Sequence, residues 1–72
     1  MSTPNVDSER LLRLPEVMRN TGLGRSAIYA KMQAGEFPPS VPISAKSRGW
    51  VASEVADWIQ HRIEARRTVA HA

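Results

Sequence analysis

Two short stretches in the first half of the chain carry apolar residues at helical spacing, and each is bounded by residues that start or stop a helix. The first helix is predicted over residues 15–20, because Pro15 suits an initial helical position and Gly22 readily takes the left-handed conformation that ends a helix. The second is predicted over residues 26–33 and ends before Gly35. Their connection is very short, which is typical of a helix-turn-helix.

The region from residue 41 to residue 51 has the pattern of two strands joined by a turn. Apolar residues alternate there with polar or proline positions, and Pro42 favours an edge strand because proline has no N–H to donate. A small, basic loop that ends at Gly49 separates the two apolar runs. We therefore expect a β-hairpin with three polar residues at or near its tip: Lys46, Ser47 and Arg48.

Helical spacing returns in the last third of the chain and predicts a third helix that begins at Ala52 or Ser53. Its apolar face carries Val55, Trp58, Ile59, Arg62 and Ile63. Ahead of the first helix, Leu11, Leu12 and Leu14, interrupted by Arg13, are expected to form a short extended stretch that leads into it. The residues expected to build the core are Ile28, Met32, Trp50, Val55, Trp58 and Ile59.

This order of elements predicts a mainly α domain with a small β-hairpin, a winged helix-turn-helix of minimal size. We expect a disordered N-terminal arm over residues 1–10, the folded domain over 11–65 and a flexible basic tail over 66–72. With 72 residues there is room for one small domain and little room for a buried catalytic cavity. The hydrophobic share of 42% is that of a folded chain rather than a disordered one.

Residue types that commonly carry catalysis or bind metals are scarce. The chain has no cysteine and only two histidines, and its glycines do not form a phosphate-binding loop. We therefore expect no enzyme activity, no metal and no cofactor. No apolar run is long enough to span a membrane and no secretion signal precedes the domain, so we expect a cytoplasmic, nucleoid-associated protein.

The formal net charge of +3 is confined to the middle of the chain. Residues 1–24 and residues 52–72 each hold three basic and three acidic side chains, whereas residues 25–51 hold four basic side chains against Glu36 alone. A positive excess concentrated in one segment is what a polyanion-binding surface requires. Chance remains an alternative, because only four basic residues carry the pattern.

The second predicted helix has an outward face of small side chains, which allows its backbone to approach the base edges in the major groove of DNA. The candidate DNA-binding residues are Arg25, Ser26, Ala27, Tyr29, Ala30, Lys31, Lys46, Ser47 and Arg48. Several alternatives stay open. The alanine face can instead pack against another helix, Tyr29 can be a half-buried core residue, and Lys46 and Arg48 can simply keep a loop solvated. Arg62 can likewise simply form part of a solvated end of the third helix, because a cation suits the negative end of the helix dipole.

The segments LPEVMRNTGLGRSAIYAKMQAGEFP and GWVASEVADWIQHRI resemble the AlpA family of phage-type regulators and excisionase-like proteins. The resemblance covers roughly residues 11–64 and implies an excisionase- or MerR-like winged-helix domain that binds double-stranded DNA. The sequence departs from the family pattern at three positions. Relatives often carry Ser or Thr in place of Gly24, Thr in place of Ala27, and Arg in place of Ala30.

The resemblance implies a regulator of a prophage or integrative element that binds operator or attachment-site DNA and controls integrase or excision genes. One alternative is a recombination directionality factor that bends attachment-site DNA beside an integrase. An alternative of another class is a protein-interaction adaptor or antirepressor that uses the alanine face. Cooperative self-association on DNA and contact with an integrase are further expectations. The residues do not distinguish activator from excisionase.

Overall fold

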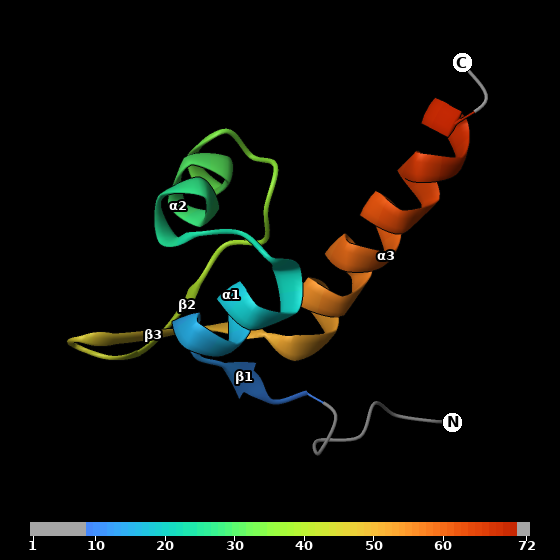
Figure 1. Ribbon diagram of the computed structural model, residues 1–72. Helices are drawn as coiled ribbons and strands as arrows, with labels where there is room; N and C mark the ends of the chain where they lie inside the picture. Colours follow the sequence, from blue (N-terminus) through green and yellow to red (C-terminus); the bar gives the residue numbers. More distant parts are fainter. Residues whose placement is uncertain (1–8, 71–72) are drawn as a thin grey trace.

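A computed structural model describes residues 9–70, with side chains described as far as residue 66. It shows a mainly α domain with three helices and a small antiparallel sheet of three strands (Figure 1). The elements follow the order expected from the sequence, with one additional paired strand. They are β1 (Leu11–Leu12), α1 (Leu14–Thr21), α2 (Arg25–Gln33), β2 (Val41–Ser44), β3 (Ser47–Val51) and α3 (Ala52–Ala70).

The sheet contains one strand more than the expected hairpin. Its strand order is β1-β3-β2, so β3 is central and β2 is an edge strand, as Pro42 indicated. Leu11 pairs with Val51 and Leu12 pairs with Trp50, so the extended stretch ahead of α1 joins the sheet. The turn of the hairpin is Ala45–Lys46, and the expectation of a loop that runs to Gly49 was wrong because β3 already begins at Ser47.

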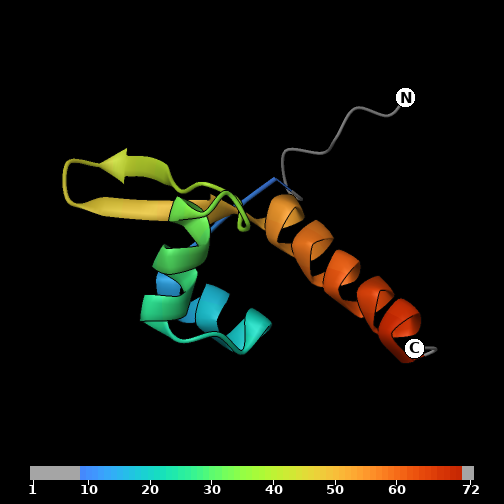
Figure 2. The same ribbon diagram turned by 90° about the horizontal axis from the view of Figure 1, so that it is seen from above.

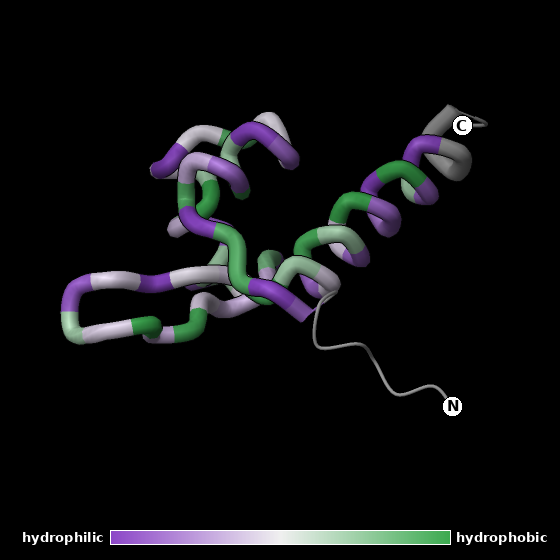
Figure 3. Tube along the Cα trace, turned by 90° about the horizontal axis from the view of Figure 1, so that it is seen from below, coloured by the Kyte–Doolittle hydropathy of each residue, from purple (hydrophilic) through white to green (hydrophobic). Residues whose placement is uncertain are grey.

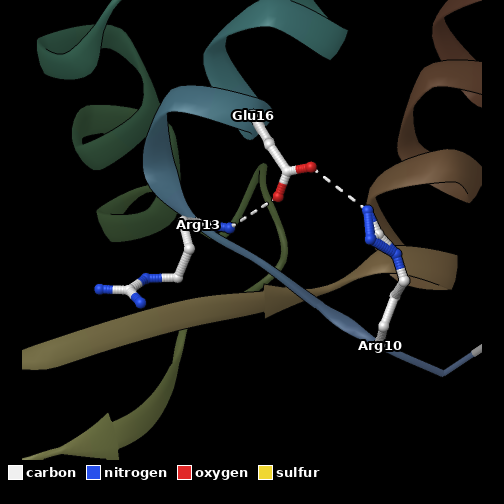
Figure 4. A network of polar contacts seen from close by, with 3 residues as sticks. All are labelled: Arg10, Arg13 and Glu16. Atoms are coloured by element: carbon white, nitrogen blue, oxygen red, sulfur yellow. Dashed lines mark hydrogen bonds and ion pairs between the residues drawn. The ribbon is translucent and has the colours of Figure 1, made fainter.

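Helix α1 is fixed at both ends by local contacts. The Glu16 carboxylate accepts a hydrogen bond from the Arg13 backbone N–H at 3.4 Å and forms an ion pair with Arg10 at 3.2 Å, while the side chain of Arg13 points away from Glu16 (Figure 4). A carboxylate in the first turn also suits the positive end of the helix dipole. At the other end Gly22 has φ 78°, which confirms its expected role in ending the helix.

The short connection from α1 to α2 is held by Thr21. Its hydroxyl donates to the Val17 carbonyl at 2.8 Å and accepts from the Leu23 backbone N–H at 3.2 Å. These bonds satisfy polar groups at the turn and fix the direction in which the chain enters α2. Helix α2 starts at Arg25, one residue earlier than expected, and Gly35 follows its end with φ 75°.

The core lies where α1, α2 and the first turns of α3 meet the sheet. Its buried members are Leu12, Val17, Ile28, Phe37, Trp50 and Val55. Three residues expected in the core, Met32, Trp58 and Ile59, are half-buried and pack against it. Leu12 and Val17 were not among the residues expected there, and neither was Phe37. Phe37 packs edge-on against Trp58 with ring centroids 5.0 Å apart, and Trp58 Nε1 donates to the Glu36 carbonyl at 2.8 Å.

The hairpin and α3 extend to opposite sides of the α1–α2 unit (Figures 1 and 2). The radius of gyration is accordingly 13.7 Å, whereas a compact domain of this length has about 11 Å. Helix α3 starts at Ala52, whose N–H donates to the Arg10 carbonyl at 2.8 Å, and it continues to Ala70. The segment expected to be a tail, 66–72, therefore begins inside α3, and residues 1–8 of the expected arm lie outside the described residues.

Candidate nucleic-acid interface

The outward face of α2 is not covered by the part of the chain that the structure describes. Ser26 and Ala30 are exposed and Ala27 is half-buried, while Ile28 on the opposite side of the helix is fully buried. Burial of Ile28 together with packing of Met32 fixes the rotation of α2 about its axis. The outward side therefore presents small side chains to solvent.

An open groove of about 610 Å³ separates this face from the hairpin. Its walls come from α2, from Ser40 ahead of β2 and from Arg48 on β3, and the lining residues are Ser26, Tyr29, Ala30, Met32, Gln33, Ser40 and Arg48. Arg48 is oriented by a short hydrogen bond in which its Nε donates to Ser40 Oγ at 2.7 Å. The bond orients the guanidinium beside the groove, where the side chain stays exposed to solvent.

A second open groove, of about 520 Å³, adjoins the first because Tyr29 and Arg48 line both. It brings three cationic side chains together: Arg13 from the residue before α1, Lys46 from the turn, and Arg48 from β3. No Asp or Glu is among the residues that line either groove in the described part of the chain. The two grooves thus combine a smooth helix face with an uncompensated positive charge.

Arg13 is the residue of this surface that sequence reasoning missed. It was counted in a charge-balanced segment, where Arg10, Arg13 and Arg19 are matched by three acids. Figure 4 shows its guanidinium directed away from Glu16, and it lines the groove with Lys46. The sequence alone contains no signal for this, because the side-chain ion pair of Glu16 with Arg10 is a property of the folded chain.

Tyr29 lies at the margin between core and surface. The residue is 36% exposed, and its ring meets that of Trp50 edge-on with centroids 6.3 Å apart. Such edge-to-face packing positions an aromatic ring while its hydroxyl stays available at the rim. Both roles considered for Tyr29 from the sequence are thus compatible with its position.

The structure groups six of the nine candidate residues around the two grooves: Ser26, Tyr29, Ala30, Lys46, Ser47 and Arg48. The others lie elsewhere on α2. Lys31 is on the flank that faces α3, with Nζ 4.0 Å from the Glu36 carboxylate. Arg25 is exposed at the start of the helix beside α1, and Ala27 is half-buried on the outward face but lines neither groove.

Other kinds of site find no support in the described residues. No group of three or more His, Cys, Asp or Glu side chains in this part of the chain is arranged to hold a metal ion. Among the same residues, no helix combines the length and the apolar character needed to cross a membrane. The distinctive feature of this surface is the face of small side chains on α2 together with the cations around it.

The cations around these grooves give the surface the charge that contact with a polyanion requires, and the family comparison agrees. The chain belongs to the family described as prophage CP4-57 regulatory protein (AlpA), whose model matches residues 10–63. It is similar to the DNA-binding transcriptional activator AlpA of Escherichia coli strain K12, with 33% identity over 81% of this chain and 91% of that protein. It is also 46% identical to the uncharacterized protein ORF88 of Enterobacteria phage P4, over 93% of this chain and 76% of that protein.

Proposed function

We propose that the protein is a DNA-binding transcriptional regulator of a prophage or integrative element, and that it binds double-stranded DNA as a winged helix-turn-helix. Helix α2 enters the major groove and the β2–β3 hairpin acts as the wing. The observation that carries the proposal is the exposed small-residue face of α2 beside the cations of the hairpin. Membership of the AlpA family, which includes a DNA-binding activator, supports it.

The physical reason is the distance of approach. A helix reads base edges only if its backbone comes close to the floor of the major groove, and long side chains on the facing surface would prevent this. Ser26 and Ala30 leave that space open, since a serine hydroxyl bonds to a base edge or a phosphate and an alanine methyl contacts a thymine methyl. Tyr29 stands at one edge of this face, where the sugar-phosphate backbone runs.

The cations then supply most of the affinity. Arg13, Lys46 and Arg48 surround one end of the groove, and Arg25 lies at the positive end of α2. In the proposed complex these four side chains neutralise phosphates, and the wing lies on the adjacent backbone or in the minor groove. Lys31 faces away toward α3, so we place it at the margin of the complex.

A direct test measures binding to duplex DNA from the promoter or attachment region of the element at several salt concentrations. Four phosphate contacts give a slope of log K against log salt of about −3 to −4. Ala30→Glu places a carboxylate against the DNA and is expected to weaken binding at least about thirty-fold. Fluorescence anisotropy measures both quantities.

Ala56→Glu is the matched control, because Ala56 is also an exposed helical alanine but lies on α3. It adds the same charge and should change the affinity by less than about twofold. Thermal melting followed by circular dichroism verifies that both variants fold. A salt slope near zero, or equal losses in the two variants, would reject the proposal.

A role as a recombination directionality factor is a second candidate, and the small side chains of Ser26, Ala27 and Ala30 on the outward face of α2 favour it. Such a face reads few bases, so binding rests largely on phosphates and on DNA shape and deformability. The mobility of circularly permuted attachment-site fragments distinguishes the two roles, because a bend makes mobility depend on the position of the site. Position-independent mobility would remove the bending role and leave the regulator.

A further inference from the structure

A third groove, of about 500 Å³, lies on the other flank of α2, between the α1–α2 turn and the part of α3 beyond its packed first turns. It shares no lining residue with the two grooves of the proposed DNA-binding surface. Its floor is apolar and its edges carry basic side chains. The lining residues are Thr21, Leu23, Lys31, Trp58, Ile59, Arg62, Ile63 and Arg66.

The apolar floor exists because α3 carries its hydrophobic pattern further than the core extends. Val55 is buried, Trp58 and Ile59 are half-buried, and Ile63 is 42% exposed, so burial decreases along the helix while the apolar spacing continues. Figure 3 shows hydrophobic positions recurring along the part of α3 that projects from the body. An apolar stripe that continues past its own core is a surface suited to a partner.

The rim of this groove is positive. Lys31, Arg62 and Arg66 line it, and none of its lining residues in the described chain is acidic. Glu36 approaches Lys31 only at the 4.0 Å limit of an ion pair, and Arg62 stacks over the ring of Trp58 at 5.7 Å. Three cations therefore flank an apolar floor with little compensation, and carboxylates from a partner would relieve their mutual repulsion.

We propose that this groove binds an acidic amphipathic helix of a partner protein. Two other occupants fit less well. A second copy of this chain would bring basic rim against basic rim in a symmetric contact, and the described face of α3 with Glu54, Asp57 and Glu64 carries no continuous apolar stripe for the floor. DNA would satisfy the cations but leave Ile59 and Ile63 without apolar contacts.

The dimensions suit a short helix. The part of α3 in the groove runs from Trp58 to Arg66, about 12 Å along the helix axis. A partner helix that places apolar side chains at i, i+4 and i+7 covers the same length in about two turns. Acidic residues flanking that stripe would then meet Lys31 on one side and the arginines of α3 on the other.

The experiment uses the full chain and a fluorescein-labelled synthetic helical peptide with leucine at i, i+4 and i+7 and glutamate at the flanking positions. Fluorescence anisotropy should show saturable binding with a micromolar dissociation constant. Ile63→Asp and Arg62→Glu should each weaken binding at least about tenfold, the first through the floor and the second through the rim. Both residues are exposed, so the fold should tolerate the changes.

Two matched variants serve as controls: Ile43→Asp on the hairpin, where Ile43 is 44% exposed, and Arg19→Glu on α1. Neither residue lines the groove, so both should bind the peptide as the unmodified protein does. A peptide with lysine in place of every glutamate should bind at least about tenfold more weakly.

Four results of the peptide and sedimentation experiments would overturn the proposal. They are absence of saturable binding at millimolar peptide, equal losses in the control variants, equal binding of the lysine peptide, and self-association in sedimentation that Ile63→Asp abolishes. The last would assign the groove to a second copy. A loss of DNA affinity in Arg62→Glu, without loss of peptide binding, would assign the rim to DNA and also overturn it. Because these readouts do not involve the α2 face, failure here leaves the proposed DNA-binding function intact.

Discussion

Gly49 shows how closely the three strands approach one another. It is a buried residue of the central strand β3, and a Cβ built on it would lie 2.9 Å from Ile43 Cδ1, 3.1 Å from the Leu12 carbonyl oxygen and 3.2 Å from Leu11 Cβ. The side chain of Ile43 can move aside, but the backbone oxygen of the neighbouring strand cannot move without disturbing the pairing of β1 with β3. Glycine is therefore required at this position by space.

Gly49→Ala should lower the free energy of unfolding by about 1–3 kcal/mol, because the added methyl overpacks the junction of the strands. Urea denaturation followed by tryptophan fluorescence measures the change. Gly24→Ala is the control, since Gly24 has φ −82° and a methyl group added there would meet no atom within 4 Å. It should stay within about 1 kcal/mol of the unmodified protein. An unchanged free energy of unfolding in Gly49→Ala would show that β1 can shift to accommodate the methyl group.

At the scale of elements, the β2–β3 hairpin carries two cations to the side of α2. The hairpin is joined to the body by the pairing of β3 with β1 and by burial of Trp50 in the core, and Arg48 donates a hydrogen bond to Ser40 at the groove. The hairpin is thus a positioned arm whose charged residues lie at a defined place relative to the helix. Its contribution to DNA binding should be electrostatic and should therefore depend on salt.

Arg48→Ala is expected to reduce the magnitude of the salt slope of DNA binding by about 0.9 while leaving the ranking of DNA sequences unchanged, as loss of one phosphate contact predicts. Binding isotherms at several salt concentrations measure the slope. Arg62→Ala removes the same charge from α3 and should leave the slope unaltered. If both variants change the slope equally, the hairpin has no special role.

Local signals in the sequence were sufficient for the order of the helices and the hairpin, although β3 begins earlier and α3 ends later than expected. Gly22 and Gly35 both have the positive φ expected of residues that end helices, and the apolar spacing identified the buried side of α2. Contacts between distant segments were not predictable in this way. The pairing of Leu12 with Trp50 depends on how the core brings the ends of the domain together, which no local pattern encodes.

The same distinction applies to the site. Lys46, Ser47 and Arg48 were predicted together because they are neighbours in the chain, and the groove shows that they also lie beside Tyr29. Arg13 was missed because only the three-dimensional approach of α1 to the hairpin places it there. The position of Lys31 toward α3 likewise depends on the direction taken by the last helix, which periodicity does not give.

At the scale of the whole molecule, the two ends of α3 have different roles: its first turns stabilise the core, and its far end projects from the body. The contacts that join this helix to the body involve its first turns, where Val55 is buried, whereas the described residues from Gln60 to Arg66 are exposed. The core therefore depends on the start of α3 and only weakly on its far end. Figure 2 shows this division as a helix that leaves the body at an angle.

A chain that ends at Glu64 should have a free energy of unfolding within about 1 kcal/mol of that of the full chain, because little apolar surface is buried beyond that point. A chain that ends at Ala56 should fail to fold, since it loses Trp58 and Ile59 from the edge of the core. Thermal melts by circular dichroism distinguish the two. A large loss on ending at Glu64 would mean that the far end of α3 packs against the body more firmly than its exposure indicates.

The departure of α3 from the body has a consequence for assembly. A helix of 19 residues extends about 28 Å, and α3 leaves the body on the side opposite the hairpin (Figures 1 and 2). One protomer would then be able to form a ternary complex, in which nucleic acid and a second protein are bound at once without displacing each other. The second protein would be brought to the DNA site without a conformational change in this chain. The two surfaces would bind independently, so the free energy of forming the ternary complex is the sum of the two binding free energies.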